Sequence, residues 1–336
     1  MTRNQRLIVI AGIVISAIFL LLAFQGLQLG DVWAHIQRAN VALLLIGAAW
    51  FFVSLVFMAL RWQYLLRSIR QVSVWQLSQL VSIGYMGNNV YPFRAGEFLR
   101  AFLLQRNNGV PFAKGMVVAV AERVFDGLVM LTFIFVSLSL LDISNPDLQS
   151  IVNVGTPVFL IALAVFFFLA ARPNLLRQLV AVVTRPLPEK LRDIVLGLSE
   201  DILESLGGFR KPADLVGTVL WSYLSWILHS GVYWLVALAF DLHLDFPTLL
   251  LVVGAVNLAG LIPASPGQLG VFEFFVVVVL TSIGTPEAQA TAYALVVHLV
   301  IWLPVTLFGF ILLARYGLGW NALVRARDLE NKAVVS

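Results

Sequence analysis

Nine ionisable side chains lie within sequence that is otherwise apolar. Glu122 and Asp126 are about one helical turn apart, with Arg123 beside them, in the stretch AERVFDGL. A charge inside a membrane-embedded segment is costly unless it is paired or hydrated, so each of the nine is a candidate for ligand binding, ion coupling or a structural ion pair. They are Arg94, Glu97, Arg100, Arg106, Lys114, Glu122, Arg123, Asp126 and Glu273.

Three of these residues follow one another at a spacing of three, which places Arg94, Glu97 and Arg100 on one face of a helix. We expect Glu122 or Asp126 to neutralise Arg94 or Arg100 and to leave at least one arginine free for an anion. Arginine suits a phosphate because its planar guanidinium donates two parallel hydrogen bonds. In the alternative interpretation the charges only hold this segment against the helix around Glu122, and both interpretations stay open.

Turn-forming residues interrupt two apolar regions, 74–112 and 247–283. The first contains GYMGNNVYPFRAGEFLR and the second contains NLAGLIPASPGQLGVFE. Clustered Pro and Gly prevent a continuous helix. A backbone that leaves the helix within the hydrocarbon core must be buried in protein or line a wet cavity. Each region therefore predicts two half-helices joined by a re-entrant loop, a common form of transporter binding site.

The two loops supply candidate binding residues besides the arginines. A half-helix is expected to begin near Gly270, and its N-terminal amides are suited to bind a phosphate oxygen. A purely structural Pro/Gly turn is the alternative. The candidate lipid- or phosphate-binding residues are Asn88, Asn89, Arg94, Arg100, Ser265, Gly267 and Gly270. The charge network or coupling residues are Glu97, Glu122, Arg123, Asp126 and Glu273, and the loop-shaping residues are Pro92, Gly96, Pro263 and Pro266.

The composition, 60% hydrophobic and 12% charged, is that of an all-α integral membrane protein. Runs of about 20 apolar residues can cross the bilayer. With both interrupted regions treated as re-entrant, the predicted cytoplasmic segments hold sixteen Lys and Arg residues, Arg61 among them, and the opposite side holds only Arg38. This asymmetry places both termini in the cytoplasm, and we expect the inner membrane as the location. The six spans are expected at 7–27, 41–60, 115–141, 151–171, 215–240 and 288–314.

The order of elements predicts an inverted repeat. Residues 1–141 give two spans, a re-entrant loop and a third span, and residues 142–314 give the same order in the opposite orientation. The second half also holds an amphipathic cytoplasmic segment, 172–214, and a cytoplasmic tail follows at 315–336.

Several classes of function lack their sequence signals. The chain has no cysteine, no GxxxxGK[ST] phosphate loop, no GxSxG and no HExxH, and its four histidines are scattered. We therefore expect no catalytic residues, no metal, no cofactor and no nucleic acid.

The three motifs NNVYPFRAGEFLRAFLL, AERVFDG and LIPASPGQLGVFE, in this order, resemble the lysylphosphatidylglycerol synthase transmembrane-region family, also called the flippase-like domain family, which includes the UPF0104 proteins. The likeness covers about 7–314. Some relatives fuse this region to an aminoacyl- or glycosyltransferase. The resemblance therefore implies the part that binds or translocates lipid, without a synthase domain and without enzyme activity.

These observations predict a protein that binds a polar-headed, anionic lipid and moves it between leaflets without ATP hydrolysis. The lipid would be a phospholipid, a glycolipid or a polyprenyl-linked lipid. Two alternatives stay open. One is a secondary transporter of a small solute or ion. The other is an accessory protein that presents lipid to a separate glycosyl- or aminoacyl-transferase.

Overall fold

The computed structural model describes residues 3–24, 28–67, 69–91, 94–141, 172–184, 212–260 and 264–317, with isolated positions in the gaps. Within these ranges every regular secondary-structure element is a helix. The expected all-helical fold class is thus confirmed. The helices are α1 Arg3–Phe24, α2 Leu29–Arg38, α3 Val41–Leu66, α4 Val74–Val90, α5 Gly96–Asn108, α6 Phe112–Leu140, α8 Pro173–Val183, α10 Pro212–Ala239, α11 Phe246–Ala259, η2 Pro266–Gln268, α12 Val271–Ser282 and α13 Glu287–Arg315.

Four helices in the described part are long and apolar enough to cross a membrane: α3, α6, α10 from Leu215, and α13. Their outer faces are apolar. On α13, for example, Leu299, Leu303, Leu307 and Ile311 recur at every fourth position and are all exposed. Small polar side chains such as Ser54 are instead buried between helices, where Ser54 Oγ donates to the backbone of Phe51. An apolar exterior around a partly polar interior is the arrangement of a multi-pass membrane protein.

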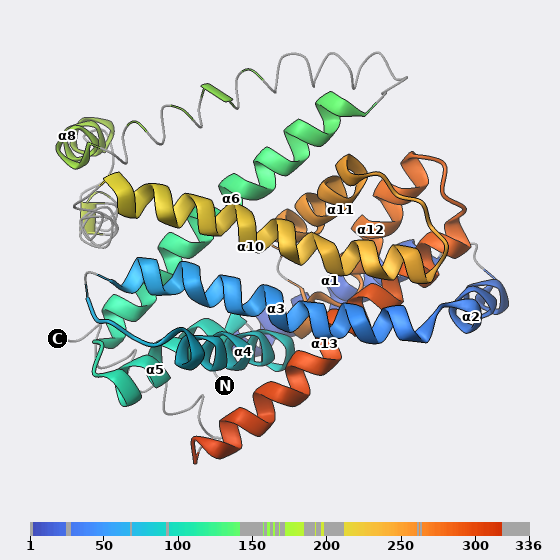
Figure 1. Ribbon diagram of the computed structural model, residues 1–336, viewed down its shortest axis with the longest axis horizontal. Coiled ribbons are helices and arrows are strands. Elements are labelled where there is room, and N and C mark those ends of the chain that lie inside the picture. The colour runs from blue at the N-terminus through green and yellow to red at the C-terminus, as the bar shows by residue number, and fades with distance from the viewer. Residues whose placement is uncertain are drawn as a thin grey trace.

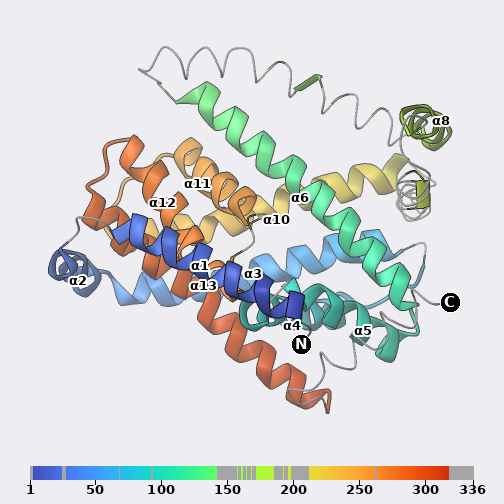
Figure 2. The same ribbon diagram turned by 180° about the vertical axis from the view of Figure 1, so that it is seen from behind.

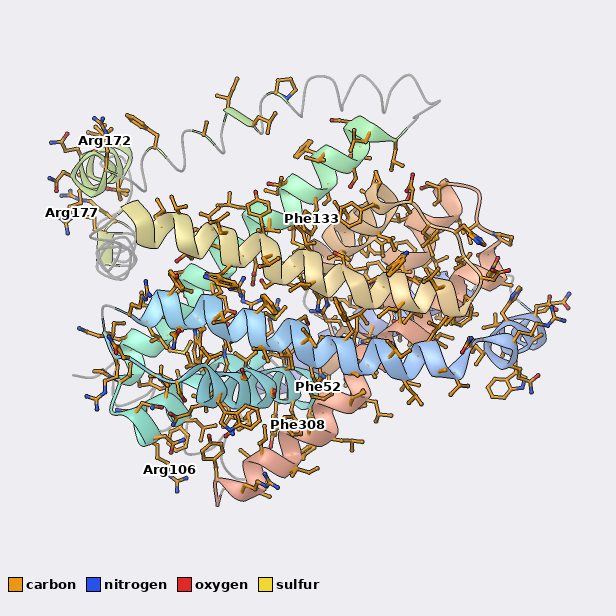
Figure 3. All side chains as sticks on the ribbon, viewed as in Figure 1. Phe52, Arg106, Phe133, Arg172, Arg177 and Phe308 are labelled. Carbon is orange, nitrogen blue, oxygen red and sulfur yellow. The ribbon has the colours of Figure 1, made fainter. Side chains whose placement is uncertain are left out.

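Helices α3 and α10 lie side by side along the length of the molecule, and α6 crosses behind them (Figure 1). On its other side α3 packs against α13 through an edge-to-face contact of Phe52 with Phe308, whose ring centroids are 5.3 Å apart (Figure 3). These helices form a frame around two shorter broken helices.

Each broken helix is a hairpin of two half-helices. α4 and α5 lie toward the end of the molecule where α3 ends and α10 begins, whereas α11 and α12 lie toward the opposite end (Figure 1). Seen from behind, α1 crosses the second hairpin and packs against α12 (Figure 2). The polar caps of these helices fit their sequence: Ser73 Oγ accepts from Gln76 N before α4, and Asp245 Oδ1 accepts from Thr248 N before α11.

Two expectations from the sequence need correction, and one helix was not predicted. That helix is α2, a separate amphipathic helix between α1 and α3. The second span runs to Leu66 and not to residue 60, because Trp62, Leu65 and Leu66 continue its buried face. Arg61 therefore does not lie in a cytoplasmic loop: its side chain is 1% exposed inside the bundle.

The predicted span at 151–171 and most of the amphipathic segment 172–214 lie outside the described residues. Within that segment the structure describes α8, which begins after Arg172 and contains Arg177. These two arginines and Arg106 of α5 lie toward the same end of the molecule (Figure 3). The position of these three basic residues at one end agrees with the charge asymmetry of the sequence.

Candidate functional site

A cavity of about 260 Å³ lies where the two broken helices meet. Its walls come from the end of α4, the break before α5, the end of α11, the η2 turn and the start of α12. Residues of α1, α5, α6, α10 and α13 complete the lining. A hydrogen bond of 3.2 Å from Arg94 Nη1 to the carbonyl oxygen of Gly260 joins the two breaks directly. The polar residues of both interrupted regions thus converge on one site.

Glycine makes the first hairpin possible. A Cβ on Gly96 would lie 1.9 Å from the carbonyl oxygen of Gly84, and a Cβ on Gly87 would lie 2.5 Å from Gly96 Cα. The Asn88 side chain accepts the Gly96 N–H at 3.0 Å and so satisfies one of the free amides at the start of α5. Gly96 therefore has the loop-shaping position that its sequence suggested, with Asn88 beside it as a cap.

The second break is held on two sides. Ser16 of α1 donates to Ser265 Oγ at 2.8 Å and accepts from Ser265 N at 2.9 Å. Gly267 has φ 74°, and a Cβ there would lie 2.6 Å from Trp302 Nε1 of α13. Any side chain at this position would therefore clash with α13 in addition to straining the backbone.

Each break also contains a residue other than glycine with a left-handed backbone: Arg94 has φ 52° and Gln268 has φ 60°. Both line the cavity. Such conformations are unfavourable for side chains with a Cβ and are concentrated at functional sites. The finding also corrects the placement of Arg94, which lies in the break before α5 and not on the same helical face as Arg100.

Behind the cavity, a buried carboxylate joins two arginines. Glu122 of α6 lies 2.5 Å from Arg61 Nη2 of α3 and 2.5 Å from Arg100 Nη2 of α5, and all three side chains are 4% exposed or less. Asp126, one turn along α6, also pairs with Arg61 and accepts from Trp226 Nε1 of α10 at 2.6 Å. Four helices therefore meet at this cluster.

Arg100 is committed to this cluster. Besides its pairing with Glu122, its guanidinium lies 4.5 Å from the centre of the Trp62 ring. The expected pairing of Glu122 with Arg100 is present, and Asp126 pairs instead with Arg61 and Arg123.

Two arginines face the cavity more openly. Arg123 is 35% exposed and contacts Glu97 at 3.2 Å and Asp126 at 3.3 Å. Arg94 is 39% exposed, and its carboxylate contact in the described part of the chain is Glu97 at 3.9 Å. Counting Arg61, Arg94, Arg100 and Arg123 against Glu97, Glu122 and Asp126, four positive charges minus three negative charges leave one positive charge. Arg94 is the arginine with the longest ion-pair distance.

Glu273 supports the second break from within α12. Its Oε2 accepts the N–H of Gly270 at 2.6 Å, and its Oε1 lies 2.6 Å from Nδ1 of His298 on α13. A Cβ on Gly270 would lie 2.3 Å from the backbone oxygen of Ser16. Gly270 is therefore packed against α1 with its amide already used, and it does not line the cavity.

Gly96 and Gly270 are packed against neighbouring backbone and do not line the cavity, and the other sequence-predicted residues fall into three groups. The carboxylates do not line the cavity and instead pair with arginines or accept a backbone amide: Glu97, Glu122, Asp126 and Glu273. Pro92 and Pro263 lie outside the described residues. The predicted residues that line the cavity are Asn88, Asn89, Arg94, Arg100, Arg123, Ser265, Pro266 and Gly267.

Sequence reasoning missed two important residues, Arg61 and Trp226, and it did not identify the partner of His298. Arg61 was assigned to a loop, yet the apolar period of its helix continues to Leu66 and would have placed it on the buried face. Trp226 gave no local signal, and the partner of His298 could not be identified, because Asp126 and Glu273 lie on other helices.

Within the described ranges no group of three or more His, Cys, Asp or Glu side chains is arranged to hold a metal ion. The site instead combines arginine, amide and aromatic side chains around a small space that apolar side chains also line. Such a site is suited to bind an anion by charge-assisted hydrogen bonds.

Curated relatives are membrane proteins and one transferase. The chain is 26% identical over 326 residues to "Glycosyltransferase AglD" of Haloferax volcanii, covering 87% of this chain and 52% of the relative, so it spans about half of that protein. It is 24% identical over 335 residues to a "UPF0104 membrane protein" of Methanothermobacter thermautotrophicus, covering 94% of each chain. A second UPF0104 membrane protein of that organism is 23% identical over 336 residues, covering 94% of this chain and 97% of the relative.

No solved structure matches the chain. The family described as "Lysylphosphatidylglycerol synthase TM region" matches residues 9–309, which include both broken helices and every arginine of the cluster. The chain therefore belongs to the lysylphosphatidylglycerol synthase transmembrane-region family.

Proposed function

We propose that this protein binds the anionic headgroup of a membrane lipid in the cavity between its broken helices and moves the lipid between leaflets. One observation carries the proposal. Arg94, Arg100 and Arg123 line the cavity, and no Asp or Glu of the described residues does. Because charges are expensive at membrane depth, an uncompensated arginine facing a cavity favours an anionic ligand.

Arg94 is the residue that we expect to bind the phosphate. It is partly exposed to the cavity, it has the weakest ion pair of the cluster, and its strained backbone holds it in the break. Arg100 is occupied by Glu122 and Trp62, so its contribution is the positive field of the cluster. Asn88, Asn89 and Ser265 would complete the hydrogen bonds to the headgroup.

The size of the cavity favours a headgroup and not a whole lipid. Its volume of about 260 Å³ is slightly below the ~300–1,000 Å³ typical of sites for drug-sized ligands. The acyl chains would therefore remain in the bilayer against the exposed apolar faces of the helices. A cationic headgroup is disfavoured by the same three arginines.

In the proposed membrane arrangement six spans and two re-entrant hairpins form an inverted repeat. The helix pairing supports it: α4 of the first half packs against α13 of the second, and α11 of the second half packs against α6 of the first. α3 and α10, the equivalent spans of the two halves, pack against each other. If each helix is exchanged for its equivalent in the other half, α4 for α11 and α6 for α13, the same pairs of helices are in contact, as an inverted repeat requires.

We further propose an inner-membrane location with both termini in the cytoplasm. Without Arg61, fifteen of the sixteen basic residues assigned to the cytoplasmic side remain there. The sequence has no GxxxxGK[ST] loop, so lipid movement would run down a gradient or be coupled to an ion gradient.

A second candidate function is the presentation of lipid to a separate glycosyltransferase. It is favoured by the relative named "Glycosyltransferase AglD", which is about twice as long as its match to this chain. In that case the cavity would bind the lipid without moving it to the other leaflet.

Binding to lipid nanodiscs tests the proposed site. Arg94→Gln keeps side-chain length and some hydrogen bonding but removes the charge, and Arg106→Gln removes an exposed charge at the end of α5. A charge-assisted hydrogen bond contributes about 1.5–3 kcal/mol, so Arg94→Gln should bind phosphatidylglycerol at least about tenfold more weakly. Arg106→Gln should bind like the parent, and a neutral diacylglycerol should be insensitive to both changes. Equal loss for the charged and neutral lipids would refute the phosphate site.

A further inference from the structure

The cavity contains an oriented histidine that the anion site does not use. His298 of α13 is 7% exposed and lines the cavity, and its Nδ1 lies 2.6 Å from Oε1 of Glu273. The ring of Phe272 stacks on the imidazole with centroids 4.2 Å apart and an interplanar angle of 21°. One edge and one face of the imidazole are therefore fixed.

The surroundings of Glu273 assign the proton on Nδ1. Glu273 lies in the first turn of α12 and accepts the Gly270 N–H at 2.6 Å. A carboxylate oxygen accepts hydrogen bonds and does not donate them, so Nδ1 of His298 is the donor and carries a hydrogen.

The other ring nitrogen is left for the cavity. In the part of the chain that the structure describes, Nε2 of His298 has no hydrogen-bond partner. In the neutral ring it presents a lone pair, and on protonation it becomes a donor beside the space that the headgroup would occupy.

We propose that Nε2 of His298 is a proton-binding site and that the protein takes up a proton there when an anionic headgroup enters the cavity. The inference rests on the proposed anion site. The proton comes from solvent, adds to the Nε2 lone pair and leaves when the headgroup leaves. Headgroup and proton would thus be bound together, which is the requirement for coupling lipid movement to a proton gradient.

The charges around the cavity determine whether anion binding favours or opposes protonation of His298. Three arginines, Arg94, Arg100 and Arg123, oppose a further positive charge in the empty cavity. A bound phosphate offsets their field and favours the imidazolium. The other titratable groups that line the space are Tyr85, Tyr91, Tyr233 and His229. Of these, His229 is the nearest equivalent to His298, but its Nδ1 contacts Ser54 Oγ at 3.5 Å and has no carboxylate partner among the described residues.

Calorimetry can count the protons. A short-chain phosphatidylglycerol would be titrated into the purified protein in buffers of different ionisation enthalpy, between pH about 6 and 8, where histidine changes charge. The phosphodiester stays singly charged over this range, so any proton taken up goes to the protein. The wild type should take up close to one proton on the alkaline side of this range. Its affinity should rise as the pH falls, by up to about tenfold per unit.

Two variants assign the proton to one nitrogen. His298→Asn places an amide N–H near Nδ1, which keeps a donor for Glu273, and removes Nε2. It should bind the lipid with no proton uptake and with little dependence on pH. His229→Asn, the matched control, should keep the proton uptake of the wild type.

The outcomes separate the two proposals. Binding by the wild type without proton uptake overturns this inference and leaves the anion site standing, whether or not the His298 variant folds. Unchanged uptake in His298→Asn, or loss of uptake in His229→Asn, also overturns it. Absence of phosphatidylglycerol binding by the wild type overturns the anion site and this inference with it.

Discussion

Replacement of Glu122 by glutamine should destabilise the protein more than any other single loss of charge in the cluster. The carboxylate lies 2.5 Å from both Arg61 and Arg100, and these side chains are 3%, 1% and 4% exposed. After Glu122→Gln, Arg61 keeps its ion pair with Asp126, but the Arg100 guanidinium keeps only its contact with the Trp62 ring in the described part of the chain. Removing one partner of a buried ion pair costs about 3–5 kcal/mol, because the remaining charge is left buried and unpaired.

Glu97→Gln is the matched control. Glu97 is 18% exposed and its partners, Arg94 and Arg123, are 39% and 35% exposed, so its loss should cost no more than about 1 kcal/mol. Thermal unfolding in detergent, followed by tryptophan fluorescence, measures both variants. At about 2–4 °C for each kcal/mol, Glu122→Gln should lower the Tm by several degrees more than Glu97→Gln does.

A double variant tests the cause of this loss. In Glu122→Gln with Arg100→Gln the unpaired charge is gone, so the double variant should be more stable than Glu122→Gln alone. Equal Tm values for Glu122→Gln and the parent would contradict the buried-pair reasoning. So would a double variant whose loss is the sum of the two single losses.

The remaining predictions concern the hairpin, the cluster and the topology. Gly96→Ala should prevent folding, because its Cβ would lie 1.9 Å from a backbone oxygen, whereas Gly127→Ala, with no atom within 4 Å, should be stable in the same expression and size-exclusion assay. Trp226→Phe should lower the free energy of unfolding by about 1.5–3 kcal/mol in a denaturant titration, since it removes the hydrogen bond to a carboxylate; an unchanged midpoint would refute that role. In intact cells, a cysteine at Asp241 should react with an impermeant thiol reagent and one at Arg106 should not, and the reverse pattern would invert the proposed orientation.

The broken helices could be predicted from the sequence because their cause is local. Pro and Gly interrupt an apolar run, and the backbone must leave the helix within a few residues of them. The structure has α4 ending at Val90 and α5 beginning at Gly96, and α11 ending at Ala259 and α12 beginning at Val271. The charged character of the site was equally visible, since charges are rare in such sequence.

Apart from the pairing of Glu122 with Arg100, the partners of those charges could not be predicted. Arg61 and Glu122 are 61 residues apart, and His298 and Glu273 lie on different helices. Helical periodicity relates residues within one helix and carries no information on which helices pack together. The position of Arg94 depends on a left-handed backbone that the residue type itself does not favour, so only the folded break reveals it.

A translocation assay in proteoliposomes measures directly whether the protein moves lipid between leaflets. Phosphatidylglycerol with a fluorescent label on an acyl chain is placed in both leaflets, and a membrane-impermeant reductant bleaches the outer one. We predict that the protein makes the inner pool accessible, that Arg94→Gln slows this at least about tenfold, and that Arg106→Gln does not. Bleaching no faster than in protein-free liposomes, under either sign of an imposed pH gradient, would contradict lipid movement. Equal bleaching by the parent and Arg94→Gln would contradict the role of the cavity.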